Sequence, residues 1–267
     1  MAIVTVSREL AALGDETAKE IAKFLDYRLI DKDTLEQQIQ SYGIKAKKFK
    51  KYDERKPSFF AALSPDRDEY LHYLRRAILD EVEKGNCVIV GRGANLILNN
   101  VPALISTFIS ARSEVRVERV KSHFRCDERR AWQIIERSDR DRIGFHRYFF
   151  DIDWKSPGNY HLSFNTGNFS PGDCAEVVKS LKDRVFTRGA EAQNAAILKN
   201  MVLEHQIKHS VLYEQELPIR SFETSVSGNI VTLHGSTNSQ TLMDATVNLA
   251  RQVAGRATVR NEIQIFR

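Results

Sequence analysis

The chain has 267 residues and a mass of 30.6 kDa, which predicts either one large domain or two smaller ones. Apolar residues make up 42% and charged residues 28% of the sequence, a balance that argues against a disordered chain. No apolar run approaches the roughly 18 residues that a membrane helix needs. The first residues carry no charged leader, so we expect no signal peptide.

The cysteines and the charge narrow the class of protein further. The three cysteines lie far apart and form no Cys-x-x-Cys pair: Cys87, Cys126 and Cys174. This spacing argues against a disulfide framework or a standard zinc site and favours the cytoplasm. The net charge is +5 with a pI near 9.0, and four of the five excess positive charges precede residue 187. An excess of positive charge this small, spread over 186 residues, favours small anionic ligands over nucleic acid.

Residues 1–186 alternate apolar segments with helical patterns. The expected strands are residues 2–6, 87–90, 103–109 and 161–166. The expected helices are residues 70–84, 114–124 and 128–141, with a further helix carrying Ala18, Ile21, Ala22 and Leu25 on one face. Apolar strands that alternate with helices are typical of a parallel sheet covered on both faces. We therefore predict an α/β domain over residues 1–186.

The C-terminal residues have a different pattern. A predicted helix over residues 190–209 precedes a β-hairpin whose turn is Gly228-Asn229. A second helix follows through Leu242 and Leu249, and alternating apolar residues up to Ile265 predict a last strand. The order α-β-β-α-β predicts a small, separate α+β module over residues 187–267.

The segment between the first strand and the next helix is a candidate phosphate-binding loop. It reads Ser7-Arg8-Glu9-Leu10-Ala11-Ala12-Leu13-Gly14-Asp15-Glu16-Thr17. Amides at a helix N-terminus attract phosphates, but the usual loop also has several glycines and a lysine. This loop has one glycine, Gly14, and Asp15 stands roughly where the lysine belongs. The residues alone leave two interpretations open, ordinary capping of the helix by acids and phosphate binding.

Five segments, in order along residues 1–185, resemble the cytidylate-kinase-like family of P-loop kinases. They are residues 4–9, 26–33, 88–95, 110–119 and 136–142. The last of them is similar to the lid of cytidylate kinases. The resemblance implies a P-loop kinase-like parallel sheet with helices on both faces and a lid. It also implies a nucleoside monophosphate kinase that uses ATP and Mg²⁺.

The resemblance implies roles for individual arginines. The lid arginines close over the phosphates in the family, and Arg140 and Arg142 match them, with Arg137 in support. Arg116 and Arg119 match the arginine-bearing helix before the lid. Phosphoryl transfer depends on positioning and charge neutralisation, so the predicted catalytic residues are Arg116, Arg119, Arg140 and Arg142. From the residues alone, surface ion pairing and a solvated helix face remain the alternatives.

The remaining site residues are predicted to bind nucleotide. Arg92 and Asp31 match positions that hold the acceptor, although Lys32-Asp33 replaces the small residue and glycine that follow the aspartate in typical members. The predicted donor-phosphate contacts come from the loop: Ser7, Arg8, Gly14 and Thr17. Arg8 is the candidate to supply the charge of the missing lysine. We expect no metal site built from side chains.

Two further features of this domain have two interpretations each. The lysine-rich run over residues 45–51 could attract an acidic partner or nucleic acid, or could be a solvated helix flank. The aromatic residues behind the lid could stack on a base or pack beneath the lid. They are Phe145, Tyr148, Phe149, Phe150 and Trp154.

The C-terminal residues, over about 190–267, look like a BON domain. Residues 227–235 match its hairpin and residues 259–263 its last strand. The resemblance implies a module that binds a protein partner or phospholipid. Two hypotheses follow for the whole chain. One is a kinase acting on CMP or dCMP, and the other is a catalytically impaired nucleotide-binding sensor or scaffold, because the loop lacks its lysine and most of its glycines.

Overall fold

A computed structural model describes residues 2–43, 66–185 and 188–266. The lysine-rich run over residues 45–51 lies outside the described residues. The chain forms two compact units, Met1–Asn194 and Ala195–Arg267. The division falls inside the helix α10 (Arg188–His209), whereas the sequence pattern changes at residue 187.

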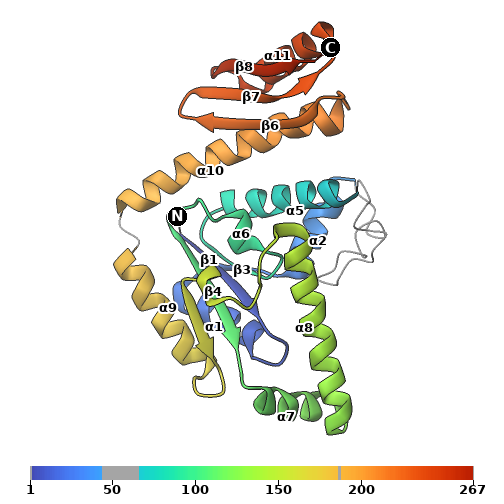
Figure 1. The fold of residues 1–267 in the computed structure, drawn as a ribbon. Coiled ribbons are helices and arrows are strands. Elements are labelled where there is room, and N and C mark those ends of the chain that lie inside the picture. The colour runs from blue at the N-terminus through green and yellow to red at the C-terminus, as the bar shows by residue number, and fades with distance from the viewer. Residues whose placement is uncertain (1, 44–65, 186–187, 267) are drawn as a thin grey trace. The chain divides into compact units, whose positions relative to one another are not determined.

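The first unit contains a five-stranded parallel sheet in the order β2-β3-β1-β4-β5 (Figure 1). The strands are β1 (Ile3–Arg8), β2 (Arg28–Ile30), β3 (Cys87–Val90), β4 (Leu104–Ser110) and β5 (Leu162–Asn165). β1 is central, so Val4 pairs with Val88 on one side and Ile105 on the other. The sequence pattern does not predict β2, because a three-residue strand with two half-buried side chains carries little apolar signal.

Helices cover both faces of this sheet. The helices of this unit are α1 (Gly14–Leu25), α2 (Lys32–Ser41), α5 (Asp66–Glu83), α6 (Ala94–Ile97), α7 (Ser113–Phe124), α8 (Glu128–Phe150) and α9 (Pro171–Val185), with a 3₁₀ turn at Pro157–Asn159. One face packs against α1 and α9, where Ile21 and Val178 are fully buried with Val4. Figure 1 shows α5 and α6 on the other side of the sheet. The predicted parallel sheet with helices on both faces is confirmed.

The lid segment forms the middle of one long helix, α8. The sequence pattern predicts this helix to residue 141, but it continues to Phe150 because buried aromatic side chains extend its apolar face. Phe145 and Phe149 are buried with their ring centroids 4.8 Å apart, and Trp154 is buried behind them. These three rings therefore pack in the core. Phe150 lies against Gly93, where an added Cβ would be 2.4 Å from its ring.

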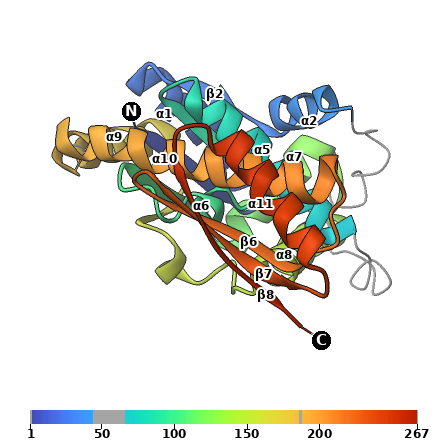
Figure 2. The same cartoon turned by 90° about the horizontal axis from the view of Figure 1, so that it is seen from above.

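The second unit has the predicted element order. The rest of α10 leads through a π-helical turn (Ser210–Glu214) to β6 (Arg220–Ser227), β7 (Ile230–Thr237), α11 (Gln240–Ala254) and β8 (Thr258–Ile265). β7 pairs with β6 antiparallel and with β8 parallel. Figure 2 shows α11 alongside these strands, where Val247 and Ala250 share a core with Val231 and Leu233. None of the described helices is apolar over a stretch long enough to span a bilayer.

Candidate nucleotide site

The loop between β1 and α1 bends at two left-handed positions. Ala11 has a φ of +59° and Leu13 a φ of +56°, a backbone conformation that glycine adopts without strain and other residues do at a cost of order 1 kcal/mol. Gly14 follows, and the side chain of Arg8 passes directly over it. A Cβ at Gly14 would lie 2.2 Å from the Cβ of Arg8. The loop thus keeps glycine-type bends at positions occupied by alanine and leucine.

Two arginines of α7 hold this bend. The Nε of Arg116 donates to the carbonyl of Leu10 at 2.8 Å, and the Nη1 of Arg119 donates to the carbonyl of Ala11 at 3.0 Å. Arg119 also donates to the carbonyl of Thr166 at 2.7 Å, which ties the loop to the end of β5. Since a trans peptide group points its N–H away from its carbonyl, the amide of Ala11 faces away from Arg116 and has no acceptor among the described residues.

A buried ion network joins the loop to α8. Arg116 donates two bonds to the carboxylate of Asp139, at 2.7 and 3.0 Å, and its Nη1 lies 3.3 Å from the carboxylate of Glu9. The Nζ of Lys155 bridges the same two acids, at 2.7 Å from Glu9 and 2.8 Å from Asp139. The network fixes α8 over the loop through four charges from four parts of the chain.

The network shifts the pKa values of two of its members. Burial would raise the pKa of Asp139, but the hydrogen bonds from Arg116 and Lys155 outweigh it and hold this pKa below its ordinary value. Burial would lower the pKa of Lys155, but its bonds to Asp139 and Glu9 raise it. Both groups are therefore charged at neutral pH.

Asp15, at the position where a phosphate-binding loop usually carries lysine, is ion-paired with Arg8. The Nε of Arg8 lies 3.0 Å from the Oδ1 of Asp15. Asp15 is largely exposed, whereas the side chain of Arg8 is mostly covered. The loop therefore presents a cation from β1 and an acid from α1, side by side.

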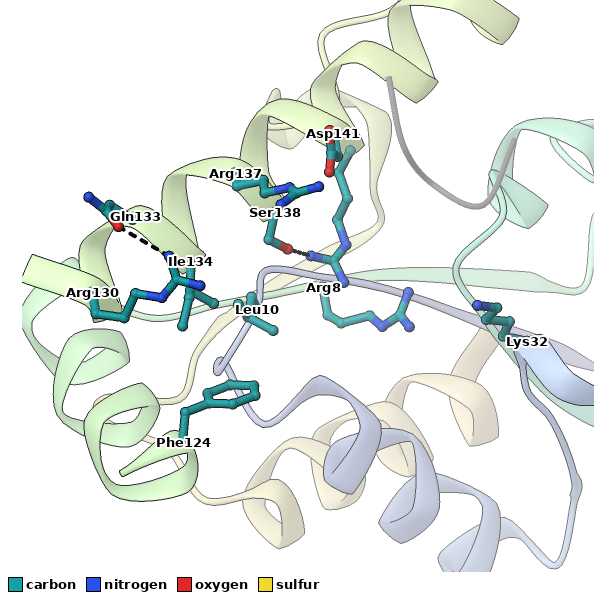
Figure 3. A pocket seen from close by; sticks show the side chains of 11 residues that line it. Arg8, Leu10, Lys32, Phe124, Arg130, Gln133, Ile134, Arg137, Ser138 and Asp141 are labelled. Atoms are coloured by element: carbon teal, nitrogen blue, oxygen red, sulfur yellow. Dashed lines mark hydrogen bonds between the residues drawn. The ribbon is translucent and has the colours of Figure 1, made fainter. Parts of the chain in front are cut away.

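An arginine-rich cavity of about 530 Å³ lies between this loop and α8 (Figure 3). Its lining residues are Arg8, Leu10, Lys32, Phe124, Arg130, Gln133, Ile134, Arg137, Ser138, Asp141 and Arg142. Five of these side chains are basic and one is acidic, so the lining favours a polyanion. Arg142 comes from α8 and lines this cavity, and its guanidinium donates to the hydroxyl of Ser138.

A second cavity, of about 290 Å³, adjoins the first at the loop. It is lined by residues 8–11 and 13–16 together with Arg119, Val120, His123, Phe124 and Arg142. The two cavities share Arg8, Leu10, Phe124 and Arg142. One continuous region therefore runs from the phosphate-binding loop to the lid helix.

The structure separates the two lid arginines. Residues two apart on a helix point in nearly opposite directions, so Arg142 lines the arginine-rich cavity and Arg140 does not. Arg140 lines a third cavity, of about 340 Å³, with Arg116, Asp139 and Lys155. Its side chain is 66% exposed and pairs with Glu136 at 3.3 Å.

Four of the predicted binding residues lie outside these three cavities. Ser7 and Thr17 are buried, and the hydroxyl of Thr17 donates to the carbonyl of Leu13 at 2.7 Å. Asp31 caps α2, where it accepts from the amide of Thr34 and has a lowered pKa through that bond. Arg92 is buried and donates to the carboxylate of Glu36 at 2.9 Å.

Sequence reasoning missed several residues of the site. Arg130 and Ile134 line the cavity together with Arg137, and their spacing of four and seven residues places them on one face of α8, so helical periodicity could have indicated them. Glu9 and Lys155 bond each other across 146 residues, and no local pattern reveals such a pair.

The strand order, the helices on both faces and the loop at the end of the central strand define a P-loop kinase-like domain. A family model described as the cytidylate kinase-like family matches residues 3–168, more than half of the chain, and a BON domain model matches residues 201–265. The chain belongs to the cytidylate kinase-like family and carries a BON domain.

The comparison with solved structures also finds matches. An uncharacterized protein from Eubacterium ventriosum matches with a TM-score of 0.54 and 22% identity, over 68% of this chain and 99% of that one. A shikimate kinase from Bacteroides thetaiotaomicron matches with a TM-score of 0.41 and 16% identity, over 68% and 98%. The YorR protein of Bacillus subtilis, in complex with phosphorylated GDP, matches with a TM-score of 0.37 and 14% identity, over 68% and 96%. A comparison with curated protein sequences found no match.

Proposed function

We propose that the first unit is a nucleoside monophosphate kinase that transfers the γ-phosphate of ATP to CMP or dCMP. The observation that carries this proposal is that Arg8, Arg137 and Arg142 line one cavity beside the β1–α1 loop. Phosphoryl transfer needs cations around a polyanion and a geometry that excludes water, more than it needs covalent chemistry from the protein.

Different residues of the first unit have different roles in this phosphoryl transfer. Arg142 and Arg137 neutralise the transferring phosphate from α8, and Arg8 takes the place of the missing loop lysine by exchanging Asp15 for a phosphate oxygen. Arg116 and Arg119 position the loop through its carbonyls. An oxygen of the acceptor phosphate attacks the γ-phosphorus, and ADP leaves with the electrons of the broken P–O bond.

The acceptor is proposed to lie at the ends of β2 and β3, near Asp31 and Arg92. Arg92 is buried and already bonded to the partly exposed Glu36, whose carboxylate an acceptor phosphate would replace. Mg²⁺ supplies further neutralisation of the ATP phosphates when it is bound. The described residues contain no group of three or more acidic, histidine or cysteine side chains that could hold a metal. Mg²⁺ usually takes most of its ligands from substrate phosphates and water, and the same coordination is proposed here.

A second candidate function is a nucleotide-binding sensor with little turnover. The observation that favours it is the carboxylate of Asp15 beside Arg8, because a negative charge in the loop opposes the donor phosphates. In either case the BON domain is proposed to bind a protein partner or phospholipid, in the cytoplasm.

The kinase proposal is tested by ADP release from Mg-ATP with CMP, dCMP, UMP, AMP or no acceptor. We expect turnover that depends on CMP or dCMP and that falls about 100-fold in Arg142→Ala, the loss typical of one charge contact to a transition state. Arg140→Ala is the paired variant, since the two arginines lie on different faces of α8, and we expect it to lower turnover by less than about threefold. Nucleotide binding without acceptor-dependent turnover would overturn the kinase and support the sensor.

A further inference from the structure

The arginine-rich cavity is chemically uneven from one end to the other. Figure 3 shows Leu10, Ile134 and Phe124 gathered on one side of it, while Arg8 and Lys32 extend along the other. Arg137 and Arg142, both of α8, also line the cavity. A ligand that suits both ends has a flat apolar part and a chain of negative charges.

The apolar end of the cavity packs against the core on one side and is exposed to solvent on the other. Leu10 and Ile134 pack against the buried cluster of Val117, Val120, Ala131 and Ile135 between α7 and α8, so their positions are fixed. Phe124, by contrast, is 52% exposed on the last turn of α7. The ring of His123 meets it edge-on at 4.7 Å. Phe124 therefore presents an accessible aromatic face to a cation-lined cavity.

Resting on the proposed function, we propose that Phe124 is a specificity-determining residue on which the base of the donor nucleotide stacks, with Leu10 and Ile134 beneath it. The base is the donor's because Phe124 also lines the cavity of the β1–α1 loop. The proposed acceptor residue Asp31 adjoins Lys32, which lies at the opposite end of the arginine-rich cavity.

The same geometry indicates which nucleotide bases the site distinguishes. At the apolar end, the polar side chains among the lining residues are Arg130 and Gln133, which bond each other at 3.3 Å. Stacking responds to the area of the base and not to the pattern of its edge. We therefore expect Mg-ATP and Mg-GTP to bind within about threefold of each other and pyrimidine triphosphates to bind more weakly.

The test is calorimetric titration of the full chain with Mg-ATP and with inorganic triphosphate at the same Mg²⁺ concentration. Inorganic triphosphate has the charges of the donor but no base. The variants are Phe124→Ala, Phe124→Trp and the matched control Phe24→Ala, which removes an exposed ring of α1 that lines none of the three cavities described above.

We expect Phe124→Ala to weaken Mg-ATP binding about tenfold and to leave inorganic triphosphate binding unchanged, because base stacking is lost and the phosphate contacts are not. Phe124→Trp is expected to bind Mg-ATP at least as tightly as the native chain, and Phe24→Ala to bind both ligands as the native chain does. Equal effects of Phe124→Ala on the two ligands, or none on either, would refute stacking while the proposed function stands. Failure of the native chain to bind either ligand would overturn both.

Discussion

Replacing Arg116 by lysine tests whether this arginine positions the loop. The guanidinium makes three strong hydrogen bonds, to the carbonyl of Leu10 at 2.8 Å and to the carboxylate of Asp139 at 2.7 and 3.0 Å, with its side chain 3% exposed. A lysine keeps the charge, but its single nitrogen cannot reach both partners in this geometry. Each bond to a charged group contributes about 1.5–3 kcal/mol. Losing two of the three while keeping the charge should lower the free energy of unfolding by about 3 kcal/mol, against a typical total of about 5–15 kcal/mol.

The assay is urea unfolding followed by tryptophan fluorescence. Both tryptophans, Trp132 and Trp154, lie in the first unit, so the signal reports that unit separately from the BON domain. The control is Arg140→Lys, whose exposed pair with Glu136 should contribute less than about 0.5 kcal/mol. If Arg116→Lys unfolds within 0.5 kcal/mol of this control, Arg116 does not hold the loop and the argument fails.

Three further results are expected. The stabilisation from Asp139, whose pKa is lowered, is present above about pH 4 and lost as the pH falls through the folded value. The stabilisation from Lys155, whose pKa is raised, is present below about pH 10.5 and lost as the pH rises further. Because Asp139→Asn removes the acid group, its free energy of unfolding, measured in urea, should depend less on pH at the acid end than that of the native chain. Gly93→Ala should cost at least about 2 kcal/mol by thermal denaturation, since φ is +65° and its Cβ would overlap an aromatic ring; an unchanged melting temperature would contradict this packing. Asp15→Asn should tighten Mg-ATP binding several-fold by releasing Arg8 from its carboxylate, and weaker binding would show that the acid helps the site.

Local pattern predicts most of the fold. The strands β1, β3, β4 and β5, the helices α1, α5, α7 and α8, and the C-terminal α-β-β-α-β order follow from the spacing of apolar residues. This spacing does not predict the helices α2, α6 and α9. β2 is missed because its three residues are too few for a pattern to show. The length of α8 is underestimated because its last turns carry aromatic side chains, which are buried in a core that the sequence pattern does not reveal.

The site is harder to predict from the sequence than the fold, because its hydrogen bonds join residues that lie far apart in the chain. Arg116 contacts Leu10 across 106 residues and Asp139 across 23, and neither spacing is periodic. The opposite directions of Arg140 and Arg142, by contrast, follow from helical geometry once α8 is known to be continuous.

The central claim is that the cavity between the β1–α1 loop and α8 holds nucleotide phosphates. The most direct test is calorimetric titration of the full chain with Mg-ATP, for the native protein and for Arg142→Ala. The account predicts binding at micromolar to millimolar concentration that weakens about tenfold or more in the variant, as expected for one lost charged hydrogen bond. Equal affinities for the two proteins, or no binding by the native chain in that range, would contradict it.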